Sequence, residues 1–140
     1  MDTRVEQALE KHRKGYNCAQ AVACTYCDFV GIDEDLMFKM IEGFGSGMGG
    51  MECTCGAVSG AIALAGMKNS NGSDNPTSKA ETYQLSKEIL KKFEEMNGTV
   101  ICRELKGIDT KKVLRTCDGC IRDAVEIVEE ILFGNDSSKG

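Results

Sequence analysis

One stretch of the chain, residues 56–67, carries no charged side chain, although charged residues make up 28% of the sequence. It consists of Gly, Ala, Val, Ile, Leu, Met and a single Ser. Ala and Gly are poor strand formers, and the length of the stretch favours a helix over a strand. A helix that is apolar on every side is a buried helix. The stretch, which begins near Thr54, therefore predicts a buried central helix whose small residues let neighbouring backbones come close.

Helical periodicity covers most of the remaining chain, because apolar residues recur every three to four positions between charged ones. The other predicted helices cover residues 3–14, residues 18–30, the segment from Asp33 to the glycine run at 43–50, the segment from Pro76 to about 96, and residues 117–133, with a short piece at 99–105. No linker or repeat divides the chain. We predict an all-α fold, a single compact domain of about five to six helices over residues 1–134, with a glycine-rich loop before the buried central helix and a disordered tail at 135–140.

Residues that start and stop helices support these boundaries. Asn17, Asp33 and Thr116 are suited to cap the helices that follow them. Gly31 is suited to end the second helix, and Pro76 is suited to the first turn of the helix before 96. Four apolar residues are expected on one side of the third helix: Leu36, Met37, Met40 and Ile41.

Cysteine is the residue type whose number needs an explanation. The eight cysteines are Cys18, Cys24, Cys27, Cys53, Cys55, Cys102, Cys117 and Cys120, against one histidine. Eight in 140 residues is about 6%, below the roughly 8–10% that is typical of a disulfide scaffold. Residues 1–6 contain no apolar segment of the kind that directs secretion. We therefore expect a cytoplasmic location, where thiols stay reduced and many cysteines indicate metal binding or catalysis.

Charge and hydropathy exclude further classes of protein. The net charge of −5 argues against a general nucleic-acid binder. No run of about 18 apolar residues is present, so we expect no membrane insertion. The methionine-rich segment 37–51 is a candidate interface for a homodimer.

Three of the cysteines directly follow a residue that can cap a helix. These are Cys18, Cys55 and Cys117, which come after Asn17, Thr54 and Thr116. The N-terminus of a helix presents free backbone N–H groups and a partial positive charge. Such a position stabilises a thiolate over a thiol, and the thiolate is the form that binds metal and attacks disulfides. The pattern therefore indicates redox or metal chemistry at helix starts.

Three other candidates are interpreted as structural. Cys24 and Cys27 lie three positions apart on a predicted helix among apolar residues, and we expect them to face the core as small hydrophobic side chains. His12 lies on a charged helix and is not predicted to be a metal ligand. A set of Ser, His and Asp for nucleophilic catalysis has little basis in a chain with one histidine.

Short motifs in the chain match known sites only formally. Residues 117–120 form a C-x-x-C motif and residues 53–55 a C-x-C motif, but no βαβ pattern of a thioredoxin and no zinc-ribbon spacing accompanies them. The glycine run contains G-x-G-x-x-G at 45–50, but a helix rather than a strand precedes it, which disfavours dinucleotide binding. We interpret the run as a loop whose backbone approaches a bulky group, such as a metal–sulfur cluster, closely.

Taken together, these segments resemble a known family. The matching residues are Gly15-Tyr16-Asn17-Cys18-Ala19-Gln20-Ala21-Val22, the glycine run with Met48-Gly49, Cys55-Gly56-Ala57-Val58-Ser59-Gly60, Cys102-Arg103-Glu104-Leu105, and Cys117 ahead of Asp123-Ala124. From about residue 4 to 133 the chain resembles the C_GCAxxG_C_C family, whose members are described as redox-active. The resemblance implies four motif cysteines, here Cys18, Cys55, Cys102 and Cys117, with Cys120 competing with Cys117 for the fourth place. A related domain in the split-Soret cytochromes is associated with an iron–sulfur cluster, but this chain lacks the C-x-x-C-H motif for haem.

Four functions remain open from the sequence. The first is an iron–sulfur protein for electron transfer or redox sensing, with either a [2Fe–2S] or a [4Fe–4S] cluster, the four motif cysteines as cofactor and metal ligands, and another redox protein as partner. The second is a metal-free thiol–disulfide protein, in which Cys55 or Cys117 attacks and Cys53 or Cys120 resolves. The third is an interaction domain with a structural Zn(Cys)₄ site. The fourth is a helical domain with incidental cysteines.

Overall fold

The computed structural model describes residues 3–133, and within this range the secondary structure is entirely helical apart from one isolated β-bridge. The α-helices are α1 (Thr3–Arg13), α2 (Cys18–Cys24), α3 (Cys27–Val30), α4 (Glu34–Ile41), α5 (Gly56–Asn69), α6 (Lys79–Asn97), α7 (Cys102–Lys106) and α8 (Cys117–Ile131). A 3₁₀ turn (Glu42–Phe44) and a π-helical turn (Gly47–Met51) lie between α4 and α5. The predicted all-α fold is confirmed, while the tail predicted at 135–140 lies outside the described residues.

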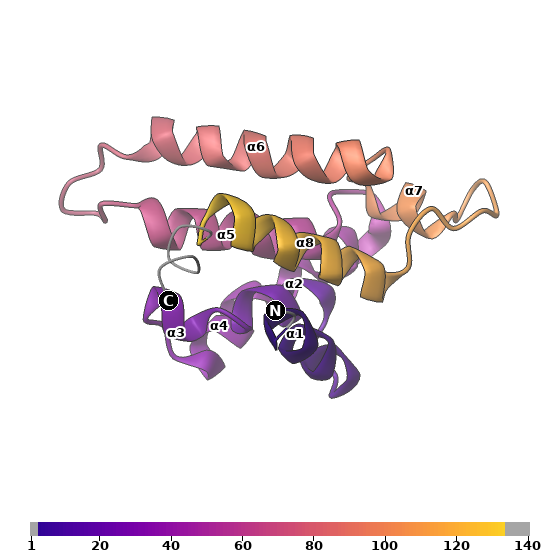
Figure 1. Cartoon of the computed structure of the whole chain (residues 1–140), viewed down its shortest axis with the longest axis horizontal. Helices are drawn as coiled ribbons and strands as arrows, with labels where there is room; N and C mark the ends of the chain where they lie inside the picture. The colour runs from indigo at the N-terminus through magenta and orange to yellow at the C-terminus, as the bar shows by residue number, and fades with distance from the viewer. Residues whose placement is uncertain (1–2, 134–140) are drawn as a thin grey trace.

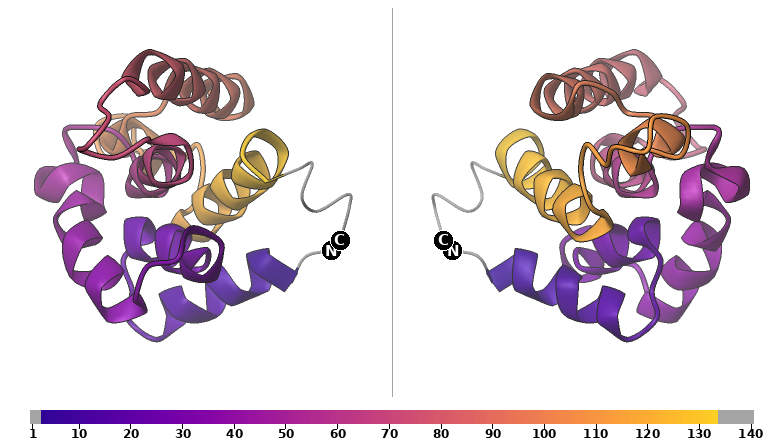
Figure 2. Two further views of the ribbon diagram at one scale, coloured as in Figure 1. Left: turned by 90° about the vertical axis from the view of Figure 1, so that its left-hand side faces the viewer. Right: turned by 90° about the vertical axis from the view of Figure 1, so that its right-hand side faces the viewer.

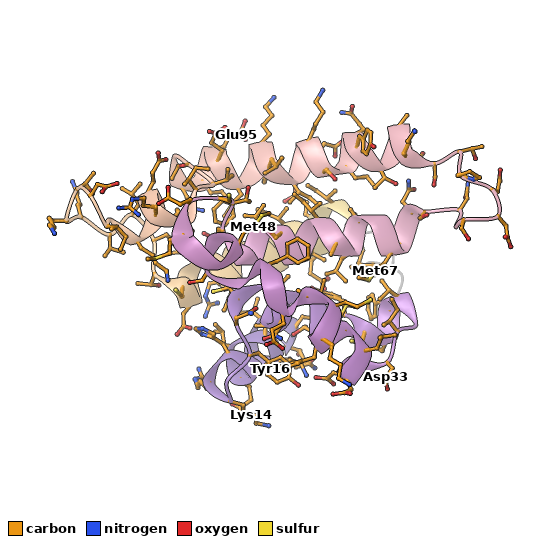
Figure 3. The ribbon with its side chains drawn as sticks, turned by 180° about the vertical axis from the view of Figure 1, so that it is seen from behind. Lys14, Tyr16, Asp33, Met48, Met67 and Glu95 are labelled. Atoms are coloured by element: carbon orange, nitrogen blue, oxygen red, sulfur yellow. The ribbon has the colours of Figure 1, made fainter. Side chains whose placement is uncertain are left out.

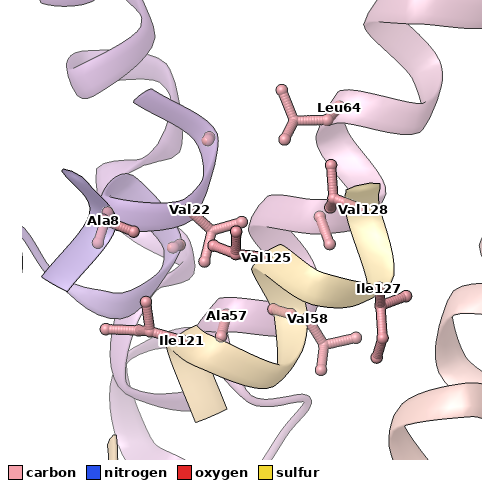
Figure 4. Close-up of a cluster of buried hydrophobic side chains, with 14 of the residues drawn as sticks. Ala8, Val22, Ala57, Val58, Leu64, Ile121, Val125, Ile127 and Val128 are labelled. Carbon is pink, nitrogen blue, oxygen red and sulfur yellow. The ribbon is translucent and has the colours of Figure 1, made fainter. Parts of the chain in front are cut away.

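Helix α5 is the central element, as its apolar sequence predicted. It contacts α2, α6 and α8, and Figure 1 shows it between α6 on one side and α1–α4 on the other. Figure 2 shows the same arrangement from the two ends of the molecule. Ala57, Val58 and Leu64 of α5 are fully buried. They pack with residues of α1, α2 and α8 in the cluster drawn in Figure 4, which labels Ala8, Val22, Ile121, Val125 and Val128.

Two glycines allow α2 and α5 to touch through their backbones. A Cβ atom added at Gly60 would lie 2.6 Å from the carbonyl oxygen of Ala19. One added at Gly56 would lie 3.2 Å from the Ala19 nitrogen. Larger residues would push the helices apart. This close contact brings the first turn of α2, which starts with Cys18, next to the first turn of α5.

The helix predicted over residues 18–30 is wrong in one respect, because the structure divides it into α2 and α3. Tyr26 leaves helical geometry with φ −113° and ψ 18°. Its fully buried ring stacks on Phe133 with 5.1 Å between centroids, and its hydroxyl donates to Glu129 at 2.7 Å. The break therefore allows Tyr26 to contact α8 and the residues that follow it. Local periodicity does not reveal such long-range contacts.

One other local prediction, that for the start of α6, needs correction. Helix α6 begins at Lys79, so Pro76 lies before the helix rather than in its first turn. The residues around Pro76 instead form a loop closed by a hydrogen bond from the Asn71 N–H to the Ser78 hydroxyl at 2.9 Å. On α4 the four apolar residues share one side, but only half of that side is covered: Met37 and Ile41 are buried, whereas Leu36 and Met40 are exposed.

The glycine run forms a loop with an unusual backbone. Ser46, Gly47 and Met48 have φ values of 56°, 58° and 65°, and Gly49 has φ 96°. L-residues rarely adopt this left-handed region, so the loop stores strain of the kind that clusters at functional sites. Figure 3 labels Met48, whose side chain is exposed on this loop. The homodimer interface at 37–51 stays a prediction.

None of the helices within residues 3–133 combines the length and the apolar character needed to cross a membrane.

Candidate redox centre

Five cysteines from different parts of the chain line one pocket. They are Cys18, Cys55, Cys102, Cys117 and Cys120, and the pocket between them has a volume of about 170 Å³. The four cysteines implied by the family resemblance are thus brought together, and Cys120 joins them. A single water needs only about 10–15 Å³ of such space. The five-cysteine pocket therefore has room for a group of several atoms.

Each of the four motif cysteines stands at the start of a helix. Cys18, Cys102 and Cys117 are the first residues of α2, α7 and α8, and Cys55 is the N-cap residue of α5. The predicted caps of α2 and α8 are confirmed. The Asn17 side chain accepts from the Gln20 N–H, and the Thr116 hydroxyl accepts from the Gly119 N–H at 3.0 Å.

The predicted cap at Thr54 is wrong, because Thr54 is held in extended backbone by an isolated β-bridge with Ile101. In this bridge the Cys55 N–H donates to the carbonyl oxygen of Val100 at 2.7 Å. The Cys102 N–H donates to the carbonyl oxygen of Cys53 at 2.9 Å. The bridge thereby joins the start of α5 to the start of α7 and places two cysteines of the pocket side by side.

The glycine loop closes on the same two helix starts. A Cβ atom added at Gly47 would lie 2.5 Å from the Cβ of Cys102 and 3.3 Å from its sulfur. Because Gly47 also has a positive φ, both backbone conformation and space favour glycine at this position. Ser46 of the same loop lines the pocket. The loop therefore approaches Cys102 closely, while its predicted approach to a bulky bound group stays a prediction.

Two pairs of thiols lie in hydrogen-bond contact inside the pocket. Cys18 donates to Cys117, and this bond is the main reason that the pKa of Cys117 falls to about 6. The charges of Lys106 and His12 lower this pKa further, whereas burial opposes the shift. The donor thiol of Cys18 has its pKa raised by the same hydrogen bond and by burial. The pair therefore consists of one thiolate and one thiol near neutral pH.

In the second pair, Cys55 with Cys120, the two pKa values are likewise shifted in opposite directions. The hydrogen bond from Cys120 is the main cause that lowers the pKa of Cys55, and the N–H groups of Ala57 and Val58 in the first turn of α5 contribute. The pKa of Cys120 is raised by that bond and by burial. Cys102 belongs to neither pair, and burial raises its pKa.

Positive side chains also line the pocket. Lys106 and Arg115 lie in the wall, and Arg115 is held by two hydrogen bonds of 3.0 Å to the carboxylate of the buried Asp123. Gly119 leaves space for this guanidinium, because a Cβ atom there would lie 2.5 Å from the Arg115 Nε. His12 lines the pocket as well, with its Nδ1 2.9 Å from the carboxylate of Asp118.

Sequence reasoning missed Lys106 and Arg115 as residues of the site. A signal existed for both, because Lys106 lies four positions after Cys102 and Arg115 lies two positions before Cys117. Residues four apart on a helix share a face, so Lys106 belongs on the face of α7 that carries Cys102. The position of Lys106 at the pocket therefore follows from helix geometry once the four cysteines are known to meet, whereas Arg115, which lies between α7 and α8, is indicated only by its closeness to Cys117 in the sequence.

The remaining cysteines lie elsewhere. Cys53 is exposed, and only its backbone takes part in the site. Cys24 is buried, as predicted, while Cys27 is half-buried; both lie at the far end of α2 from Cys18. All eight cysteines carry free thiols. Among residues 3–133, no group of three or more His, Cys, Asp or Glu side chains is arranged to hold a single metal ion.

Comparison with known proteins agrees with this geometry. A family profile described as Putative redox-active protein (C_GCAxxG_C_C) matches residues 16–131, more than four-fifths of the chain. Searches of curated proteins and of solved structures returned no match. The matched range contains all five cysteines of the pocket. The chain belongs to the C_GCAxxG_C_C family that this profile describes.

Proposed function

We propose that the five-cysteine pocket holds an iron–sulfur cluster and that the protein transfers electrons or senses the redox state through it. The ligands are Cys18, Cys55, Cys102 and Cys117. One observation carries the proposal: four cysteines from the starts of four separate helices line one pocket that has room for a group of several atoms. Cysteine thiolates are the usual ligands of both [2Fe–2S] and [4Fe–4S] clusters.

The donor set of the pocket suits such a cluster. Iron binds thiolates, and in two of the cysteines, Cys55 and Cys117, the lowered pKa already favours that form. Lys106 and Arg115 offset part of the negative charge that several thiolates bring together. Cys55 and Cys102 are 5% and 4% exposed, so the surrounding side chains exclude most water from them. When bound, the cluster supplies one-electron redox chemistry.

The residues of the chain set the conditions for that chemistry. The first turn of α5 directs the N–H groups of Ala57 and Val58 toward the sulfur of Cys55, and such hydrogen bonds tune the reduction potential of a cluster. The Gly47 backbone covers Cys102 from the loop side. Cys120 is a fifth thiol already in contact with Cys55, so it would be available to replace Cys55 as a ligand if the cluster were oxidised.

The test is reconstitution of the full chain with ferrous iron and sulfide without oxygen, followed by iron, sulfide and zinc analysis and a visible spectrum. We expect equal amounts of iron and sulfide, and loss of both in Cys55→Ser and Cys102→Ser. Cys53→Ser is the matched control, since Cys53 lies in the same segment but its exposed side chain does not line the pocket. Protein that binds zinc and no iron, or binds no metal, contradicts the proposal.

A second function is favoured by the two thiol pairs. In metal-free protein, the thiolate of Cys117 attacks a substrate disulfide, and one substrate sulfur leaves as a thiolate. The Cys18 sulfur then attacks the mixed disulfide, which releases the second substrate thiol and leaves a Cys18–Cys117 disulfide. The substrate disulfide gains two electrons and two protons. Cys55 with Cys120 offers the same arrangement, whereas Cys53 does not line the pocket as the sequence-based alternative required.

The two functions predict opposite outcomes when Cys102 is substituted. A cluster needs Cys102 as a ligand, so Cys102→Ser abolishes iron binding. A thiol–disulfide reaction at Cys18 and Cys117 does not need Cys102, which belongs to neither pair. The same variant therefore keeps its full activity with a small disulfide in that case.

A further inference from the structure

We propose that Cys24 and Cys27 form a second redox site, a reversible dithiol–disulfide pair that reacts with small disulfides independently of the five-cysteine pocket. Nothing in the family motif includes these two residues. The proposal does not rest on the function assigned to the pocket.

Cys24 and Cys27 flank the break between α2 and α3 and line the same pocket. Cys24 is the last residue of α2 and Cys27 the first of α3, and the thiol of Cys24 interacts both with Cys27 and, at 4.0 Å, with the carbonyl oxygen of Glu34. On a regular helix, Cβ atoms three residues apart are about 5–6 Å apart, which exceeds the about 3.5–4.5 Å of a disulfide. Tyr26 leaves helical geometry between them. The chain is thus not held at the spacing of an unbroken helix, and the two side chains already meet.

The pair opens onto its own pocket, of about 310 Å³. Arg4, Lys11 and Glu34 line this pocket together with both cysteines. Cys24 is 3% exposed, whereas Cys27 is half-buried and therefore the sulfur that a reagent reaches first. In a C-x-x-C pair of this kind, the accessible sulfur attacks the substrate disulfide first, and the buried sulfur then resolves the mixed disulfide.

The reaction balances with a low-molecular-weight disulfide of the glutathione type as oxidant. The Cys27 thiolate attacks one sulfur of this disulfide, a new S–S bond forms, and one small thiol leaves. The Cys24 sulfur then attacks Cys27 in the mixed disulfide, and the second small thiol leaves. The pair loses two electrons and two protons, and the small disulfide becomes two thiols. An excess of the small thiol reverses both steps.

The pair and the five-cysteine pocket lie at opposite ends of the same helix. Helix α2 starts with Cys18 and ends with Cys24. Six residues of helical rise separate them by about 9 Å along the axis. The two sites are therefore distinct in chemistry and position, yet rigidly joined.

The test is a redox titration of the full-length, metal-free protein in buffers of reduced and oxidised glutathione. Thiols are blocked with one alkylating reagent after an acid quench, and disulfides are then reduced and labelled with a second reagent. Trypsin releases the peptide of residues 15–39, which holds Cys18, Cys24 and Cys27, because no Lys or Arg lies within it before Lys39. Fragmentation of that peptide locates each label.

As the buffer becomes more oxidising, we expect Cys24 and Cys27 to change together from the first label to the second, as one two-electron transition. Both residues should carry the first label again when reduced glutathione is added. In Cys27→Ser, Cys24 should keep the first label in every buffer. Cys53→Ser is the matched control and should leave the transition unchanged, because Cys53 is exposed and lies outside both pockets. Cys24 and Cys27 that keep the first label in the most oxidising buffer would overturn the proposal, and so would a Cys18–Cys27 disulfide.

Discussion

The two ends of helix α2 carry cysteines in contrasting chemical states. At its start, Cys18 meets Cys117 in the five-cysteine pocket, where the pKa of Cys117 falls to about 6. At its end, burial raises the pKa of Cys24 to about 12, and burial also raises the pKa of Cys27. The pocket has Lys106, His12 and the first turn of a long helix, α8, beside its sulfurs. The Cys24–Cys27 pair has the carboxylate of Glu34, whose effect on the two pKa values exceeds the opposing effect of Lys11.

This contrast shows that contact between two thiols does not by itself make one of them reactive. Both regions contain such a contact. In the pocket, the hydrogen bond from the partner thiol is the main cause that lowers the pKa of Cys117 or Cys55, and positive charge or helix N–H groups add to it. In the Cys24–Cys27 pair a negative neighbour and burial keep both partners protonated. The pocket is therefore suited to hold metal, and the pair to store two electrons as a dithiol that exchanges slowly with disulfides.

The largest expected effect is the difference in alkylation rate between Cys117 and Cys24 in reduced, metal-free protein at pH 7. A thiol with pKa about 6 is mostly ionised there, whereas one with pKa about 12 is ionised about once in 10⁵. The lower nucleophilicity of the more acidic thiolate reduces this ratio to about 10². Iodoacetamide labelling followed by peptide mass spectrometry measures it.

The pH dependence of the same rates is a second readout. Between pH 7 and 9 the rate at Cys117 should stay nearly constant, because its thiolate is already formed. The rate at Cys24 should rise about tenfold for each pH unit, because the ionised fraction does so below the pKa. Parallel profiles for the two residues would contradict the comparison.

The next effect concerns the contact that joins the two regions. Gly60→Ala places a methyl group 2.6 Å from the Ala19 carbonyl and should lower the free energy of unfolding by about 1–3 kcal/mol. Gly66→Ala, also on α5, meets no atom within 4 Å and should be neutral or stabilising by up to about 1 kcal/mol. Urea denaturation measures both.

Labelling of the Gly60→Ala protein then separates the two sites. The displaced start of α2 moves Cys18 relative to Cys117, so the Cys117 rate should fall. The Cys24–Cys27 contact is local in sequence and should survive. A loss of both contacts at once would show that the two ends of α2 do not behave as separate sites.

A smaller effect is expected from the positive charge of the pocket. Lys106→Met should raise the pKa of Cys117 by about one unit, because Lys106 lowers that pKa through its charge. The ultraviolet absorbance of the thiolate, followed against pH in metal-free protein, measures the shift. Lys91→Met on the exposed face of α6 is the control and should leave the titration unchanged.

Sequence patterns predicted the buried central helix, the meeting of four cysteines and three of the four helix caps, those at Asn17, Asp33 and Thr116, because these depend on local periodicity, capping residues and a family motif. They did not predict the break at Tyr26, whose cause is packing against Phe133 and Glu129 far along the chain. The pairing of Cys120 with Cys55 also depends on how α8 crosses α5. The break at Tyr26 and the pairing of Cys120 with Cys55, which distinguish the two ends of α2, are therefore products of tertiary structure.

The smallest effect concerns the negative charge beside the Cys24–Cys27 pair. Glu34 accepts hydrogen bonds from Lys11 at 2.8 Å and from Tyr16 at 2.6 Å, and both bonds lower its own pKa, so it is ionised throughout the neutral range. Its charge raises the pKa of Cys27. Glu34→Gln removes the charge, leaves Lys11 uncompensated and should lower that pKa.

Alkylation of Cys27 at pH 8 should therefore become a few times faster in Glu34→Gln, by less than the tenfold change that one pKa unit gives. Asp35→Asn is the matched control, because it removes the same charge from the adjacent position, where Asp35 pairs with exposed Lys39 instead. An equal acceleration in both variants would mean that net charge, rather than the Glu34 carboxylate beside the sulfurs, sets the reactivity of the pair. A rate that rises only in Glu34→Gln would show that one carboxylate helps to keep this end of α2 in the thiol form while the other end favours the thiolate.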